Sequence, residues 1–188
     1  MPDSDPGASA GEAPSGNCQS GRVLVLLRHA KAERGDWGSD KDRSLSSRGR
    51  AQSAAVGRDL AAQGFAPDVA LVSSARRTKQ TFNTVAANAD WDLQAHLVDE
   101  LYQAWIEEVI ELVSRVDSAA NAVLVVGHQP TMSATAAALA DGSSRPDALA
   151  RLGGGLPTAG RAVLRVDRPW AELTPASATL VSVVTPLA

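Results

Sequence analysis

Five apolar residues in a row, from Val23 to Leu27, lead directly into Arg28 and His29. The run contains no polar side chain to face solvent, so it predicts a β-strand that is buried on both faces. Strands of this kind belong to parallel sheets that helices cover on both sides. Ligands of open α/β sheets collect at the carboxyl ends of the strands, which is where Arg28 and His29 stand. A cation beside an imidazole at that place indicates a phosphate site.

Two further apolar runs end in the same way. Residues 69–72 precede a turn and a helix that begins near Arg77, and residues 122–126 lead into Gly127 and His128. Strands that alternate with helical segments predict an α/β fold with a mostly parallel sheet. The carboxyl ends of parallel strands lie at one edge, so we expect these side chains to meet those that follow the first run.

The other elements are expected from periodicity, capping residues and breakers. We expect helices over 47–63, 75–87, 104–116 and 130–140, a short strand at 97–98, and a last strand over 161–166. The polar segment from Lys31 to Ser46 is too long for an idle connector and is predicted to face the substrate. Residues 141–144 stop a helix, and the three glycines from Gly153 form a flexible break without a nucleotide-binding pattern.

Length and composition indicate one domain. The chain has 188 residues, of which 44% are hydrophobic, enough for a substantial core. We assign residues 22–173 to this domain, residues 1–21 to a disordered tail rich in Pro, Gly and Ser, and residues 174–188 to a C-terminal edge segment or tail.

Charge and cysteine content exclude several classes of protein. The net charge of −3 gives no global basic surface, so no nucleic-acid partner is expected. Cys18 is the single cysteine, which excludes a disulfide framework and a cysteine metal cluster. No segment has the pattern of a secretory signal or a membrane span, so we expect a cytoplasmic protein without a membrane partner.

The polar residues at the strand ends suit phosphoryl transfer. His29 is the candidate nucleophile, because a neutral imidazole can attack phosphorus, and nearby cations disfavour its protonation. Arg28 and Arg77 match phosphoryl oxygens with their guanidinium forks, and His128 is a further donor. The scheme needs no metal and no cofactor. Each of these residues alone is more often structural, and the prediction rests on their joint placement; His96 lacks such a context and is taken as structural.

Four ordered motifs then resemble a known family. The segment Leu27-Arg28-His29-Ala30-Lys31-Ala32 resembles the Arg-His signature of the histidine phosphatase superfamily, and more specifically that of the SixA-type phosphohistidine phosphatases. The other segments similar to the family's motifs are Asp42-Arg43-Ser44-Leu45-Ser46-Ser47-Arg48-Gly49, Ser73-x-x-x-Arg77-x-x-x-Thr81 and Gly127-His128-Gln129-Pro130, with Leu156-Pro157-Thr158 as the turn before the last strand.

The resemblance covers about residues 22–170 and has consequences for fold and chemistry. It implies a three-layer α/β/α sandwich, phosphoglycerate mutase-like, mainly parallel with an antiparallel edge. It also implies a covalent phosphohistidine intermediate formed without metal. By spacing, Arg77 falls on the family's catalytic arginine, and Arg43 joins Arg28, Arg77 and His128 as a substrate-binding residue.

One departure concerns the general acid. Many superfamily members have a carboxylic acid that protonates the leaving oxygen, and here the only candidates are Asp99 and Glu100, which are equally well explained as solvated loop charges. A phosphohistidine substrate reduces the need for an acid, because its leaving imidazole has a reference pKa of about 6.5 and takes a proton from solvent.

Three functions remain open from the sequence. The first is dephosphorylation of phosphohistidine on a signalling protein, for which the scarcity of lid segments and the cations Arg43, Arg48, Arg76 and Lys79 argue. The second is hydrolysis of small phosphate esters such as sugar phosphates. The third is a phosphate-recognition module without turnover, against which the retention of both histidines and both arginines argues.

Overall fold

A computed structural model describes residues 21–34 and 39–186 of the chain. The predicted tail over residues 1–21 therefore lies, apart from Gly21, outside the described residues. The strands are β1 Arg22–Arg28, β2 Val69–Ser73, β3 His96–Val98, β4 Ala122–Gly127, β5 Arg161–Val166 and β6 Thr179–Val184. The helices are α1 Ser47–Ala62, α2 Arg76–Ala89, α3 Ile106–Ser114, α4 Thr131–Leu139 and α5 Pro146–Leu152, with short 3-10 helices η1 Asp40–Asp42, η2 Glu100–Tyr102 and η3 Trp170–Glu172.

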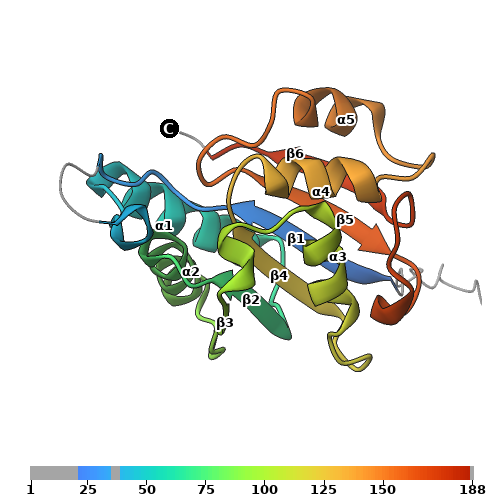
Figure 1. Cartoon of the computed structure of the whole chain (residues 1–188), viewed down its shortest axis with the longest axis horizontal. Helices are drawn as coiled ribbons and strands as arrows, with labels where there is room; N and C mark the ends of the chain where they lie inside the picture. The colour runs from blue at the N-terminus through green and yellow to red at the C-terminus, as the bar shows by residue number, and fades with distance from the viewer. Residues whose placement is uncertain (1–20, 35–38, 187–188) are drawn as a thin grey trace, which may run out of the picture.

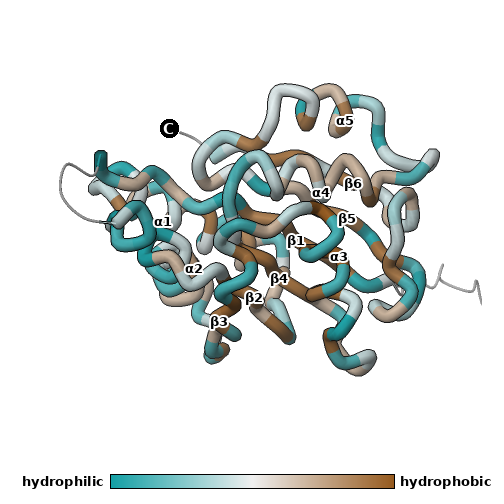
Figure 2. Tube along the Cα trace, viewed as in Figure 1, coloured by the Kyte–Doolittle hydropathy of each residue, from teal (hydrophilic) through white to brown (hydrophobic). Residues whose placement is uncertain are grey.

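The strands form one sheet in the order β3-β2-β4-β1-β5-β6 (Figure 1). The first four strands along the chain are parallel, whereas β5 is antiparallel to β1 and β6 is antiparallel to β5. Figure 2 shows the apolar strands at the centre of the molecule, with polar segments around them. The mixed sheet between helices confirms the predicted α/β sandwich.

Strand β1 contributes to both sides of the core, as its apolar run predicts. Leu24 and Leu26 join the cluster that contains residues of α3, α4 and α5. Val25 and Leu27 join a second cluster with residues of α1 and α2 on the opposite face. All four side chains are buried, so β1 packs against the helices on both faces of the sheet. Full burial of one such side chain contributes about 1.5–3 kcal/mol.

One helix was not expected, and one strand lies in a segment for which two descriptions were open. Helix α5 follows the predicted stop at 141–144, in a stretch for which we expected no helix. Strand β6 lies within the segment 174–188 that we described as an edge segment or tail, and it pairs along β5 at the edge of the sheet. In the part of the chain that the structure describes, no helix is both long and apolar enough to span a membrane.

The topology brings three strand ends together. Strand β4 lies between β1 and β2, and the three run in parallel. Arg28 is level with Gly127, and Val72 is level with Val126. The residues that follow these strands therefore emerge side by side at one edge of the sheet.

Candidate active site

The backbone around His29 is fixed by both helices of one layer. The His29 amide donates to the Gly127 carbonyl over 3.0 Å, which continues the pairing of β1 with β4. The next amide, of Ala30, donates to Thr81 Oγ1 on α2 over 3.0 Å, and the amide of Lys31 donates to Gln52 Oε1 on α1 over 3.1 Å. Side chains of two helices thus satisfy the backbone groups that leave the sheet, and they hold His29 in place.

The hydrogen bonds of His29 assign its neutral tautomer. Its Nδ1 lies 2.8 Å from the Ala30 carbonyl oxygen, which can only accept, so Nδ1 carries the proton. Its Nε2 lies 3.3 Å from Arg77 Nε, which can only donate. Nε2 is therefore unprotonated, as a nucleophile requires, and its lone pair accepts from Arg77 Nε.

Arg77 is the centre of the polar network. Its side chain is buried and comes from the first turn of α2. Besides its bond to His29, Nη1 donates to the Asp40 carbonyl over 2.6 Å, and Nη2 donates to Asp40 Oδ2 over 2.9 Å. Nη2 also lies 3.4 Å from His128 Nδ1. A single guanidinium thus links both histidines and a carboxylate.

His128 stands at the end of β4, opposite His29. Its Nε2 lies 2.9 Å from the Oγ of buried Ser73, and the ring centroids of the two histidines are 5.2 Å apart. Because Arg77 donates to Nδ1, the proton of the neutral ring belongs on Nε2 and is donated to Ser73. The hydroxyl at the end of β2 thereby sets the orientation of His128.

Both imidazoles are held neutral. The pKa of His29 is lowered to about 4, mainly by burial and additionally by the nearby charges of Arg77 and Arg28, against the opposing effect of the bond to Ala30. The pKa of His128 is lowered to about 3, mainly by burial and additionally by repulsion from His29 and Arg77. The sequence predicted a neutral His29 from its cations, whereas in the structure burial is the larger cause.

Arg28 supplies a second guanidinium. Its Nη1 donates to the Leu156 carbonyl over 2.8 Å, in the turn that precedes β5. Its Nε is buried and makes no hydrogen bond to any described residue. Burial lowers the pKa of Arg28 from its ordinary value, although a guanidinium remains charged at neutral pH.

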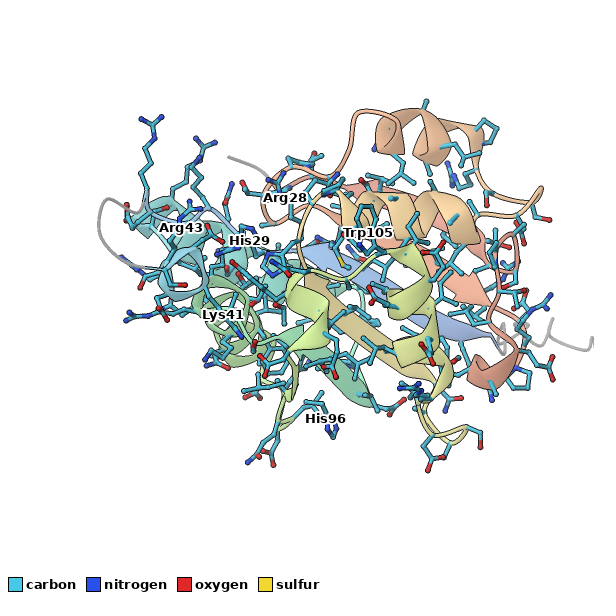
Figure 3. The ribbon with its side chains drawn as sticks, in the orientation of Figure 1. Arg28, His29, Lys41, Arg43, His96 and Trp105 are labelled. Carbon is cyan, nitrogen blue, oxygen red and sulfur yellow. The ribbon has the colours of Figure 1, made fainter. Side chains whose placement is uncertain are left out.

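These side chains line an open pocket of about 310 Å³. Figure 3 shows His29 between Arg28 and the pair of Arg43 and Lys41. The lining residues are Arg28, His29, Asp40, Arg77, Tyr102, Gln103, His128 and Gln129. Within the described part of the chain, no group of three or more His, Cys, Asp or Glu residues is placed to hold a metal ion. Two guanidinium groups and two imidazoles facing one cavity suit an oxyanion such as a phosphoryl group.

Asp40 is a charged residue of this pocket that the sequence did not single out, and Tyr102 and Gln103 are two further lining residues that it missed. The Asp40 carboxylate accepts from Arg77, from Arg43 Nη1 over 2.8 Å and from the Tyr102 hydroxyl over 2.8 Å. Hydrogen bonds from Arg43 and Tyr102, followed by that from Arg77, hold the pKa of Asp40 far below its usual range. The only available signal was its place in the polar loop, three residues before Arg43, and this did not distinguish it from Asp42.

The other predicted residues lie outside the pocket. Arg43 donates to Asp40 and, through Nε, to the Glu33 carbonyl over 2.9 Å, and it does not line the cavity. Asp99 is exposed, forms an ion pair with Lys41 at 2.7 Å and accepts from the Ser74 hydroxyl. Its bond to Lys41 lowers its pKa, which keeps it ionised at neutral pH.

Glu100 is exposed at the start of η2 and does not line the cavity either. The structure thus places neither candidate acid beside the phosphate pocket. Their loop runs past the pocket and contributes Tyr102 and Gln103 instead. His96, which the sequence analysis took as structural, is an exposed residue of β3 on the lower side of Figure 3.

Comparisons with known proteins identify the family of the chain. The model of the histidine phosphatase superfamily, branch 1, matches residues 24–105. The uncharacterized protein Rv1276c of Mycobacterium tuberculosis is 40% identical over 156 residues, which are 82% of this chain and 96% of that protein. The chain belongs to the histidine phosphatase superfamily.

Solved structures place this histidine phosphatase with the SixA-type members. The SixA structure from Nakamurella multipartitia is 35% identical, with a TM-score of 0.78, and the match covers 89% of this chain and 98% of the other. The SixA structure from Agrobacterium tumefaciens is 30% identical, with a TM-score of 0.74, and covers 88% and 98% of the two chains. These matches confirm the predicted family and type, and they support phosphatase activity in general.

Proposed function

We propose that this histidine phosphatase hydrolyses phosphohistidine carried on a protein, without a metal or cofactor and through a covalent phosphohistidine on His29. The observation that carries the proposal is the ionised state of the Asp40 carboxyl group. It is the only carboxyl among the described residues that line the pocket, and three donors keep it ionised. A leaving alkoxide needs a proton donor, whereas the imidazole of a phosphohistidine leaves with a proton from solvent.

The first chemical step uses the unprotonated Nε2 of His29, which exchanges its hydrogen bond with Arg77 Nε for a bond to phosphorus. Nε2 forms a bond to phosphorus while the phosphorus–nitrogen bond of the substrate breaks, and the leaving imidazole takes that electron pair and then a proton. Arg28 and Arg77 balance the charge on the phosphoryl oxygens as it develops. Water then attacks phosphorus, the bond to Nε2 breaks, and inorganic phosphate leaves a neutral His29.

Two further points support a substrate on a protein. The phosphate pocket is open to solvent, so it can receive a phosphoryl group that is attached to a large molecule. The two SixA structures described above carry the name phosphohistidine phosphatase.

Labelling with a phosphorylated protein tests the covalent step. We expect a denaturing alkaline quench to trap phosphate on the wild type, as a label that is stable in base and labile in acid. The label should be absent from His29→Ala. Label that persists in this variant would contradict the role of His29.

Turnover of a phosphohistidine protein against a panel of sugar phosphates tests the substrate class. A preference for the phosphohistidine protein is expected, whereas a preference for sugar phosphates would assign the enzyme to small phosphate esters. Binding of both without label or turnover would indicate a recognition module.

A further inference from the structure

The phosphate pocket lies between two surfaces of different chemistry. On the side of α1 and α2 the surface is basic, and on the side of α3 it has an apolar groove whose lining residues are uncharged. In Figure 3, Lys41 and Arg43 lie on one side of His29 and Trp105 lies on the other. Both surfaces are open, so each is available to a molecule that brings a phosphoryl group to His29.

The basic surface has five members, which we call the basic rim: Lys31, Arg48, Arg50, Arg76 and Lys79. None of them forms an ion pair with another described residue, so their charges are not neutralised within that part of the chain. Four of the five are exposed, and Lys79 is half-buried.

Short-range contacts place the rim beside the site. Lys31 is two residues from His29, and its carbonyl accepts from the Ser46 amide, where α1 begins. Arg48 and Arg50 stand in the first turn of α1, and Arg76 and Lys79 in the first turn of α2. The amino ends of both helices add their partial positive charge to this face.

The charge of the rim contrasts with the rest of the molecule. The whole chain has a net charge of −3, and α3 carries Glu107, Glu108 and Glu111 without a basic residue. The overall charge would repel an acidic partner, whereas the rim on the side of α1 and α2 would attract one. Such asymmetry fixes the orientation of a partner as well as its rate of encounter.

The apolar surface is a groove that continues from the phosphate pocket. It has a volume of about 320 Å³ and shares four lining residues with the pocket, namely Tyr102, Gln103, His128 and Gln129. The remaining lining residues are Ala104, Trp105, Ile106, Pro130, Thr131 and Ala134, none of which is charged.

Trp105 is unusual in this groove because 76% of it is exposed. Its backbone is nevertheless fixed, because its amide donates to Glu108 Oε2 over 2.7 Å where α3 begins. A large aromatic side chain that is exposed on a fixed backbone is typical of a binding surface. The groove opens beside His128, so its occupant lies next to the phosphoryl group.

We propose that this two-part surface docks the protein that carries the phosphohistidine, with acidic side chains over the basic rim and an apolar side chain in the Trp105 groove. The proposal rests on the proposed function and names its partner by chemistry. Charge complementarity selects an acidic surface on one flank, and the uncharged lining of the groove selects an apolar group on the other. The phosphohistidine between them is then delivered to His29.

Synthetic peptides with one central phosphohistidine test the rim. One peptide carries glutamates on one side and a leucine on the other, a second replaces the glutamates with lysines, and free phosphohistidine serves as the small substrate. We expect the double variant Arg48→Glu, Arg76→Glu to lower kcat/KM for the glutamate peptide about tenfold or more. Turnover of free phosphohistidine by the same variant should be unchanged.

A matched charge change outside the basic rim is the control. Arg151 on α5 and Arg168 after β5 are both exposed, so Arg151→Glu, Arg168→Glu alters the net charge equally. We expect no loss for the glutamate peptide with this control. Equal losses in the two double variants, or an equal loss with free phosphohistidine, would overturn the role of the rim.

Trp105→Ala tests the groove. We expect KM for the leucine peptide to rise about tenfold, with little change for the same peptide bearing alanine in place of leucine. Leu97→Ala is the control, because Leu97 on β3 is also exposed but does not line the groove. Equal effects on the two peptides would overturn the groove as a subsite.

Wild-type turnover of free phosphohistidine separates the two proposals. Turnover of free phosphohistidine without any preference among the peptides would overturn the docking surface and leave the proposed function standing. If no phosphohistidine compound is turned over, the proposed function is overturned. The proposed docking partner is then overturned as well, because it depends on that function.

Discussion

At the scale of single residues, the arginine fork that should receive a phosphoryl group already holds an anion. The Asp40 carboxylate accepts from Arg77 Nη2 within the pocket, and Arg43 and Tyr102 hold it there. An incoming phosphoryl group needs the same donor, because the Arg77 guanidinium contacts His29 Nε2, where the group is to be bound. Asp40 and the phosphoryl group therefore compete for Arg77.

Asp40→Asn tests this competition. The amide keeps the shape of the side chain but removes its charge, so inhibition by inorganic phosphate or vanadate should strengthen several-fold. The measurement is the inhibition constant of each anion for the variant and the wild type. Weaker inhibition by both anions would mean instead that Asp40 holds Arg77 in a productive orientation.

The buried histidines predict how stability changes with pH. Their folded pKa values of about 4 and about 3 lie below the ordinary value of 6.5. Between these limits the unfolded chain binds protons that the folded chain does not, so stability is lost as the pH falls from 6.5 towards 4. Each histidine contributes a slope approaching about 1.4 kcal/mol per pH unit.

Urea unfolding of His128→Gln between pH 7 and pH 4.5 measures this slope. We expect the variant to lose less stability than the wild type over that range, because one of the two buried histidines is gone. His96→Gln is the control, since His96 is exposed, and it should follow the wild type. Parallel curves for the wild type and His128→Gln would contradict the assignment.

At the scale of elements, the site depends on a close approach between α1 and the loop after β1. A Cβ built on Gly49 would lie 2.0 Å from the Lys31 carbonyl oxygen, so only glycine fits there. The same turn is fixed by Ser46, whose Oγ caps α1 by accepting from the Gly49 amide over 3.1 Å. The contact sets the distance between α1 and the segment that follows His29.

Gly49→Ala should therefore damage both stability and activity. We expect a loss of about 1–3 kcal/mol in the free energy of unfolding, from the overpacking of backbone against backbone. A lower kcat/KM should accompany it, because Lys31 is two residues from His29. Gly142→Ala is the control, since a Cβ there meets nothing within 4 Å, and the two variants should differ in both chemical unfolding and kinetics.

The sequence predicted those elements that have a long apolar pattern or a clear capping residue at one end. The burial of β1 on both faces followed from five apolar residues, and the start of α1 followed from Ser46 as its cap. Helix α5 has seven residues and buries only Ala148 and Leu152, which is too little to show a helical period. Strand β6 alternates weakly and is flanked by prolines, so its pairing with β5 follows only from the fold.

The candidate site divides in the same way. Arg28, His29, Arg77 and His128 were recognisable because each follows a buried strand, and the parallel topology brings their strand ends together. Asp40 was not recognisable, because its role depends on how the loop folds back over Arg77. Asp99 and Glu100 were placed by sequence order alone, which cannot tell a loop that lines the pocket from side chains that point away from it.

At the scale of the whole molecule, an ion pair of a buried arginine links helix α1 to strand β5 in the antiparallel part of the sheet. Arg161 on β5 is 1% exposed and pairs with Asp59 on α1. Its Nε is also buried and makes no hydrogen bond to any described residue, so Asp59 is the counter-charge of this guanidinium. A buried charge that loses its partner is far more costly than an exposed one.

Asp59→Ala should accordingly destabilise the whole fold by about 3–5 kcal/mol, because it leaves the Arg161 charge buried and unpaired. Asp167→Ala is the control, because it breaks the pair with Arg165 at 3.0 Å at a more exposed position, and its cost should stay below about 1 kcal/mol. Chemical unfolding of both variants measures the difference. Equal, small losses would show that water reaches Arg161 in solution, and would leave apolar packing as the main attachment of α1 to the sheet.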